Sequence, residues 1–123
     1  MNAHSQAQRA YSAASAPTRT PRNMEYEVIA RITHRIRSAD QQGNEGYSAL
    51  VEALYDNNKL WNIFAIDVAD AANQLPKELK AQVFYLAEFT QQHTSKVLAR
   101  QASVAPLLEI NTSILRGLRS GAA

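Results

Sequence analysis

The stretch that decides the fold is residues 47–79, YSALVEALYDNNKLWNIFAIDVADAANQLPKEL. Its large apolar residues recur at the spacing of one helix face, namely Leu50, Leu54, Trp61, Phe64 and Val68. A stripe of this kind is typical of a helix that packs against other helices. The stretch therefore predicts a helical bundle.

Two asparagines, Asn57 and Asn58, interrupt this stripe just before Trp61. Their amides compete for backbone hydrogen bonds, and a buried amide needs hydrogen-bond partners. Two structures are compatible with the pattern: the helix breaks at residues 56–58, or the amides face a binding groove. Further on, Pro76 disfavours helix at the residue before it and favours a new helix start, so residues 73–76 predict a sharp corner.

The same periodicity predicts the other helices. The first spans residues 21–41, the second 47–73, the third 76–101 and the last 104–119. No strand-like alternation is present. We expect an all-α fold, a small helical bundle of four to five helices. Its domain, residues 21–119, would lie between a flexible or short-helical N-terminal segment, residues 1–20, and a tail, residues 120–123.

Composition narrows the class of protein. The 123 residues include no cysteine and carry a net charge of +2, with basic ends around an acidic middle. No apolar run approaches the roughly 18 residues of a membrane span. We therefore expect a cytoplasmic protein that does not insert into membranes. The charge pattern does not produce the broad basic face of a strong nucleic-acid binder.

The residues that could carry catalysis are sparse. His4, His34 and His93 lack the spacing of metal ligands, and the four glycines form no phosphate-binding loop. No nucleophile motif is present. The sequence predicts no enzyme, no catalytic residue, no metal site and no cofactor.

Binding of another protein is better supported. Phe84, Tyr85 and Phe89 diverge from the stripe of Leu79, Val83, Leu86 and Val97, which is expected to pack the bundle. Either that third helix is central and buried all round, or one side receives a partner helix. Trp61 is likewise either a core anchor or an interface residue. Arginines at 31, 35 and 37 are interpreted as a solvated helix face, because no aromatic residues alternate with them.

Several local patterns resemble the FlaF family of bacterial flagellar biosynthesis proteins. The opening motif is Ala7–Tyr11 with Pro21, Arg22, Glu25 and Tyr26. The central one is Asn57–Trp61 with Asp67 and Asn73–Pro76, and the closing one is Glu109–Asn111 with Ile114–Leu118. These motifs follow one another in the expected order over nearly the whole chain. Residues 1–6 and 42–46 carry no motif.

The resemblance implies a small cytoplasmic helical protein needed for flagellin production and export. It implies flagellin as the partner, whose terminal segments are long amphipathic helices before the filament assembles. The expected function is a secretion chaperone that masks these helices. The alternative is a post-transcriptional regulator of flagellin synthesis that acts with FlbT on flagellin mRNA; direct RNA binding is not expected. A self-assembling structural subunit is not expected either, because no coiled-coil heptad is present. The predicted partner-binding residues are Phe84, Tyr85, Phe89, Trp61, Asn57 and Asn58.

Overall fold

The computed structural model describes residues 21–119, and all of its regular elements are helical. Helix α2 spans Pro21–Gln41 and is followed by the 3-10 turn η1, Gly43–Gly46. Helices α3, Tyr47–Ala69, α4, Lys77–Leu98, and α5, Ala105–Arg119, complete the bundle. The all-α bundle is confirmed. The segments predicted at residues 1–20 and 120–123 lie outside the described residues. Within residues 21–119, no helix is both long and apolar enough to span a bilayer.

Helix α3 runs without interruption for 23 residues, so the break considered at residues 56–58 is wrong. The reason is that both asparagine side chains are engaged with other helices. Asn57 Oδ1 accepts a hydrogen bond from Asn111 of α5, and Asn58 Oδ1 lies 3.1 Å from the hydroxyl of Thr94 in α4. An amide occupied in this way does not compete for the backbone bonds of its own helix.

The corner between α3 and α4 begins earlier than predicted, after Ala69 rather than Asn73. Asp70 Oδ1 accepts a hydrogen bond from the backbone N–H of Ala72, and Asn73 Oδ1 accepts one from Leu75. These side-chain bonds two residues onward form turns that replace helical bonding. The corner itself is confirmed, and Pro76 immediately precedes α4 as its N-cap.

The end of α4 is fixed by Arg100, which has a positive φ of 61°. Its N–H bonds the carbonyl of Val97, and the next N–H bonds that of Lys96, which together make a Schellman motif. Helix α4 therefore ends at Leu98 and not near Gln101 as predicted. The Arg100 guanidinium lies over the Tyr47 ring, 4.7 Å from its centroid, so this corner is held against the start of α3.

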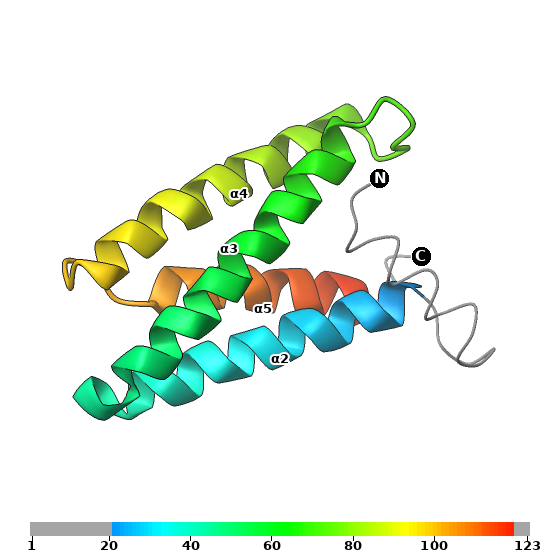
Figure 1. Cartoon of the computed structure of the whole chain (residues 1–123). Helices are drawn as coiled ribbons and strands as arrows, with labels where there is room; N and C mark the ends of the chain where they lie inside the picture. The colour runs from blue at the N-terminus through cyan, green and yellow to red at the C-terminus, as the bar shows by residue number, and fades with distance from the viewer. Residues whose placement is uncertain (1–20, 120–123) are drawn as a thin grey trace.

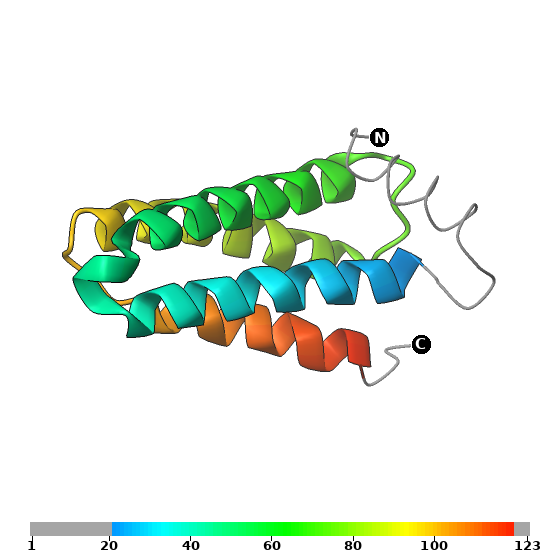
Figure 2. The same cartoon turned by 60° about the horizontal axis from the view of Figure 1, so that its bottom comes forward.

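The core lies where α2, α3 and α5 meet, and α4 packs against α3 (Figures 1 and 2). Its buried residues on α2 are Ile29, Ile32, Ile36 and Ala39, and on α3 Leu50, Ala53, Leu54, Leu60 and Trp61. Helices α4 and α5 meet near the turn at residues 99–104 and diverge from it (Figure 1). This divergence is the feature that creates the candidate site.

Candidate functional site

An apolar groove lies where α4 and α5 diverge; we call it the α4–α5 groove. Its α4 wall is made by Leu79, Gln82, Val83 and Leu86, and its α5 wall by Ile110, Ser113 and Ile114. Its volume is about 350 Å³. Leu79 is 46% exposed although it is a large apolar residue. The sequence-based expectation that this stripe packs the bundle is therefore wrong for its N-terminal part.

The groove continues into a second depression of about 250 Å³, because Val83 and Ile114 line both. The floor of this second part is formed by Trp61, Phe64 and Val68 of α3. Leu75, from the corner before α4, also lines it. The two depressions adjoin each other at Val83 and Ile114, and together they draw residues from α2, α3, α4, α5 and the α3–α4 corner.

Carboxylates lie at the rim of the second depression. Glu25 of α2 and Asp67 of α3 both contribute to its lining. The lining of the second depression therefore combines apolar side chains with two carboxylates.

The position of α5 is set by a buried hydrogen-bond network centred on Asn111. The Trp61 indole N–H donates to Asn111 Oδ1 at 3.0 Å. The Asn111 amide donates to Asn57 Oδ1 at 2.9 Å and to Thr33 Oγ1 at 3.1 Å. All four side chains are buried, and they come from α2, α3 and α5. The network thus ties α5 to α2 and α3, and α4 takes no part in it.

Helix α4 is anchored separately. The Thr94 hydroxyl lies 2.6 Å from the Thr90 carbonyl and 3.1 Å from Asn58 Oδ1. The hydroxyl donates to one of these two acceptors at a time, and its contact with Asn58 joins α4 to α3. Because α4 is tied to α3 and α5 to α2 and α3, the space between α4 and α5 stays open.

Three of the predicted partner-binding residues, Trp61, Asn57 and Asn58, lie in or beside the core. Trp61 is only 2% exposed and packs edge-on against Phe64, with ring centroids 5.4 Å apart. Asn57 is fully buried, and Asn58 is half-buried beside Thr94. The interpretation of Trp61 as a core anchor agrees with this burial. Its indole also forms part of the groove floor.

The three predicted aromatic sites of α4 do not share one face. Phe84 is 47% exposed and Tyr85 67% exposed, whereas Phe89 is half-buried and stacks on His93 at 5.3 Å. A five-residue separation places Phe84 and Phe89 about 140° apart around the helix. Phe89 follows Leu86 by three positions, so it adjoins the α4 wall of the groove. Binding of a partner stays a prediction for Tyr85 and Phe89, which lie one helical turn apart. Phe84 points in a different direction, so a partner bound at Phe84 would not be the occupant of this groove.

The groove walls were not among the predicted site residues. Leu79, Val83 and Leu86 were assigned to bundle packing because they share a helix face with buried Val97. The sequence does contain one relevant signal: Ile110 and Ile114 of α5 repeat at helical spacing just as these α4 residues do. Periodicity indicates that two faces are apolar, but it does not indicate whether they touch.

Among residues 21–119, no three His, Cys, Asp or Glu side chains gather as they would around a metal ion. The groove is lined mainly by aliphatic and aromatic side chains, which bind by shape and apolar contact.

The fold and the groove define a small all-helical protein with an open apolar groove between two diverging helices. A model of one such family, described as flagellar protein FlaF, matches residues 7–118. The chain belongs to the FlaF family of flagellar proteins. The comparisons with curated proteins and with solved structures returned no significant match.

Proposed function

We propose that the protein is a cytoplasmic flagellin-binding chaperone whose α4–α5 groove receives an amphipathic helix of flagellin before export. The observation that carries this proposal is an apolar groove left open in a member of a flagellar family. Exposed apolar surface of this kind marks binding sites in soluble proteins. A partner with a complementary apolar helix would bury it.

The groove has the right dimensions for a helix face. Leu79, Val83 and Leu86 follow one another at intervals of four and three residues along α4. They span about 10 Å, or roughly two helical turns. A helix that places apolar residues at i, i+4 and i+7 would match this length, which is how helices bind in apolar grooves.

The two carboxylates that line the second depression are compatible with the same ligand, an amphipathic helix of flagellin. An amphipathic helix has polar residues beside its apolar face, and these would come to lie near Glu25 and Asp67 at one end of the groove. Masking such a helix prevents premature association with other flagellin chains. This is the physical task of an export chaperone, and it requires affinity without catalysis.

The test is co-expression with flagellin followed by size-exclusion chromatography after nuclease treatment. A chaperone should co-elute with flagellin, and the complex should survive the nuclease. The alternative, a regulator that acts with FlbT on flagellin mRNA, predicts an association that nuclease abolishes or that requires FlbT. Absence of co-elution with purified flagellin would contradict the chaperone proposal.

The aromatic residues of α4 allow the contact surface to be located in the same assay. Phe89→Ala should weaken co-elution, because Phe89 adjoins the groove wall next to Leu86. Phe84→Ala should bind normally, since Phe84 lies about 140° from Phe89 around α4. Tyr85→Ala should weaken co-elution no more than Phe89→Ala, since Tyr85 is one turn from Phe89 but 67% exposed. Helicity and thermal melting should be recorded for each variant, so that loss of binding is separated from loss of folding.

A further inference from the structure

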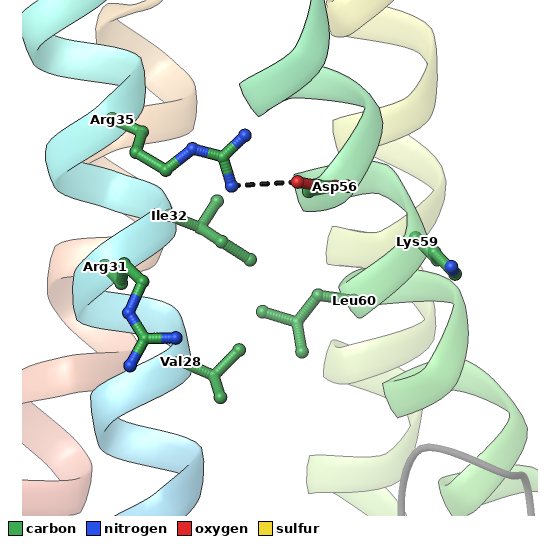
Figure 3. A pocket seen from close by; sticks show the side chains of 7 residues that line it. All are labelled: Val28, Arg31, Ile32, Arg35, Asp56, Lys59 and Leu60. Atoms are coloured by element: carbon green, nitrogen blue, oxygen red, sulfur yellow. Dashed lines mark hydrogen bonds and ion pairs between the residues drawn. The ribbon is translucent and has the colours of Figure 1, made fainter.

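A second concavity lies between α2 and α3 and differs in chemistry from the groove. We call it the α2–α3 pocket. It has a volume of about 230 Å³ and is lined by Val28, Arg31, Ile32, Arg35, Asp56, Lys59 and Leu60. Figure 3 shows Arg35 projecting from α2 toward α3 and Arg31 running along α2 toward Val28, with Ile32 and Leu60 between the helices. Two guanidinium groups thus border an apolar floor.

Arg35 is held in position by Asp56. Its Nη1 donates to Asp56 Oδ2 at 2.8 Å, and both side chains are partly buried. A guanidinium has five N–H donors, so this single bond leaves most of them for a ligand. The ion pair orients the planar group over the pocket, which lowers the entropy that a ligand must overcome.

Arg31 lies one helical turn from Arg35 and makes no hydrogen bond or ion pair with any residue in the described range 21–119. Figure 3 shows its guanidinium beside α2 near Val28, and it shows Lys59 pointing away from α2. Among the described lining residues Asp56 is the one carboxylate, and it is paired with Arg35, so Arg31 adds an uncompensated positive charge. The pocket therefore carries an excess of positive charge beside apolar side chains.

We propose that the α2–α3 pocket binds an acidic amphipathic segment of a protein partner. One carboxylate of that segment would pair with Arg31, and a second would bind the open donors of Arg35. An adjacent apolar side chain would cover Ile32 and Leu60. Charge complementarity selects this occupant, because guanidinium groups pair with carboxylates in a bidentate geometry.

The lining disfavours a nucleic acid as the occupant. Among the described residues 21–119 that line the pocket, none is aromatic, so no side chain is available for base stacking. The apolar floor of Val28, Ile32 and Leu60 has no role in a contact to a sugar–phosphate backbone. An acidic amphipathic protein segment would pair with the arginines and also cover the apolar floor.

The probe for a test is a fluorescein-labelled helical peptide of about 15 residues built from Leu, Glu and Ala, long enough to be marginally helical. Matched probes replace every Glu with Gln, or every Leu with Ser. Binding to the full chain is measured by fluorescence anisotropy. The acidic amphipathic probe should bind, both matched probes should bind more weakly, and added salt should weaken binding.

The matched protein variants are Arg31→Gln and Arg37→Gln. Both arginines are exposed on α2 and their replacement changes net charge equally, but Arg37 does not line the pocket. Arg31→Gln should weaken the acidic probe about tenfold, corresponding to one charge-assisted hydrogen bond. Arg37→Gln should change the affinity for the acidic probe less than about twofold, as expected for an exposed charge outside the pocket. Circular dichroism confirms that both variants remain folded.

Three results would overturn the proposal. The first is that the acidic probe does not bind, or binds no better than its Gln counterpart. The second is equal loss in both arginine variants, which indicates non-specific attraction to basic charge. The third is that a labelled single-stranded RNA binds through Arg31 while the acidic peptide does not.

Discussion

At the scale of single residues, Asn111 is the most consequential side chain of the core. Its oxygen accepts from Trp61, and its two amide hydrogens go to Asn57 and Thr33, so both donors and one of its two acceptor positions are used. Asn57 is satisfied only in part: its Nδ2 has no hydrogen-bond partner among residues 21–119. Asn111 is therefore the central residue of the network, and Asn57 is a peripheral one.

This asymmetry predicts unequal costs for two similar substitutions. Asn111→Leu keeps the branched shape in a larger side chain and leaves Trp61 Nε1 and Asn57 Oδ1 without their partner, whereas Thr33 keeps its bond to the Ile29 carbonyl. It should lower the free energy of unfolding by about 3 kcal/mol or more. Asn57→Leu leaves one N–H of Asn111 without its acceptor and removes an unsatisfied amide, so its cost should stay near 1 kcal/mol. Chemical denaturation measures both, with Asn62→Leu on the exposed face of α3 as the control. Equal costs at the two buried sites would show that Asn111 is not the centre.

Trp61 combines apolar burial with a hydrogen bond, and two substitutions separate them. Trp61→Ala should cost about 3–5 kcal/mol through lost burial and a cavity. Trp61→Phe keeps much of the packing but leaves Asn111 Oδ1 without its donor, which should cost about 1–3 kcal/mol. Thermal and denaturant unfolding give these values. A Trp61→Ala protein that melts normally but no longer binds flagellin would assign Trp61 to the interface instead.

The network could not be predicted from the sequence because its members are far apart along the chain. Asn57 and Trp61 were recognised as unusual positions, since an amide pair next to the only tryptophan interrupts an apolar stripe. Asn111 and Thr33 were not singled out as buried partners, because nothing in the local pattern distinguishes a buried Asn or Thr from an exposed one. Only the crossing of α2, α3 and α5 brings these side chains together.

At the scale of elements, periodicity predicted the helices and turn chemistry set their ends. Helix α2 has the predicted bounds, from a proline that suits a first helical turn to the glycine-containing turn that follows. The ends of α3 and α4 were predicted too late. The Asp70 and Asn73 side chains bond the backbone locally, and Arg100 takes the left-handed position that glycine usually occupies. The exact residue at which each helix ends depends on backbone geometry that amino-acid composition does not specify.

The junction of α2 and α3 gives an element-scale prediction. A Cβ atom at Gly46 would collide with the backbone carbonyl oxygen of Ala39, whereas one at Gly117 of α5 would meet open space. Gly46→Ala should therefore force α2 and α3 apart and cost about 1–3 kcal/mol. Gly117→Ala should stabilise the protein by about 0.5–1 kcal/mol, because alanine favours an α-helix. Melting temperatures of the two variants should shift in opposite directions, and a neutral Gly46→Ala would contradict the close approach.

At the scale of the whole molecule, the divergence of α4 and α5 is what separates this bundle from a closed one. The sequence predicted an all-helical bundle and suggested a partner surface on the third helix. It did not predict the groove, because apolar stripes specify which faces avoid water and leave the crossing angles to side-chain packing. The separate anchoring of α4 through Thr94 and of α5 through Asn111 explains why the stripe around Leu79 remains uncovered.

The central claim is that flagellin binds in the α4–α5 groove, and one matched pair of variants tests it most directly. Leu79 and Phe84 are both large apolar residues of α4, 46% and 47% exposed, but only Leu79 lines the groove. Because both are exposed, neither Leu79→Glu nor Phe84→Glu should prevent folding. The measurement is co-elution of each purified variant with flagellin, with melting temperature recorded in parallel. The account predicts that Leu79→Glu loses flagellin while Phe84→Glu retains it. Retention by a folded Leu79→Glu variant, or loss in Phe84→Glu alone, would contradict it.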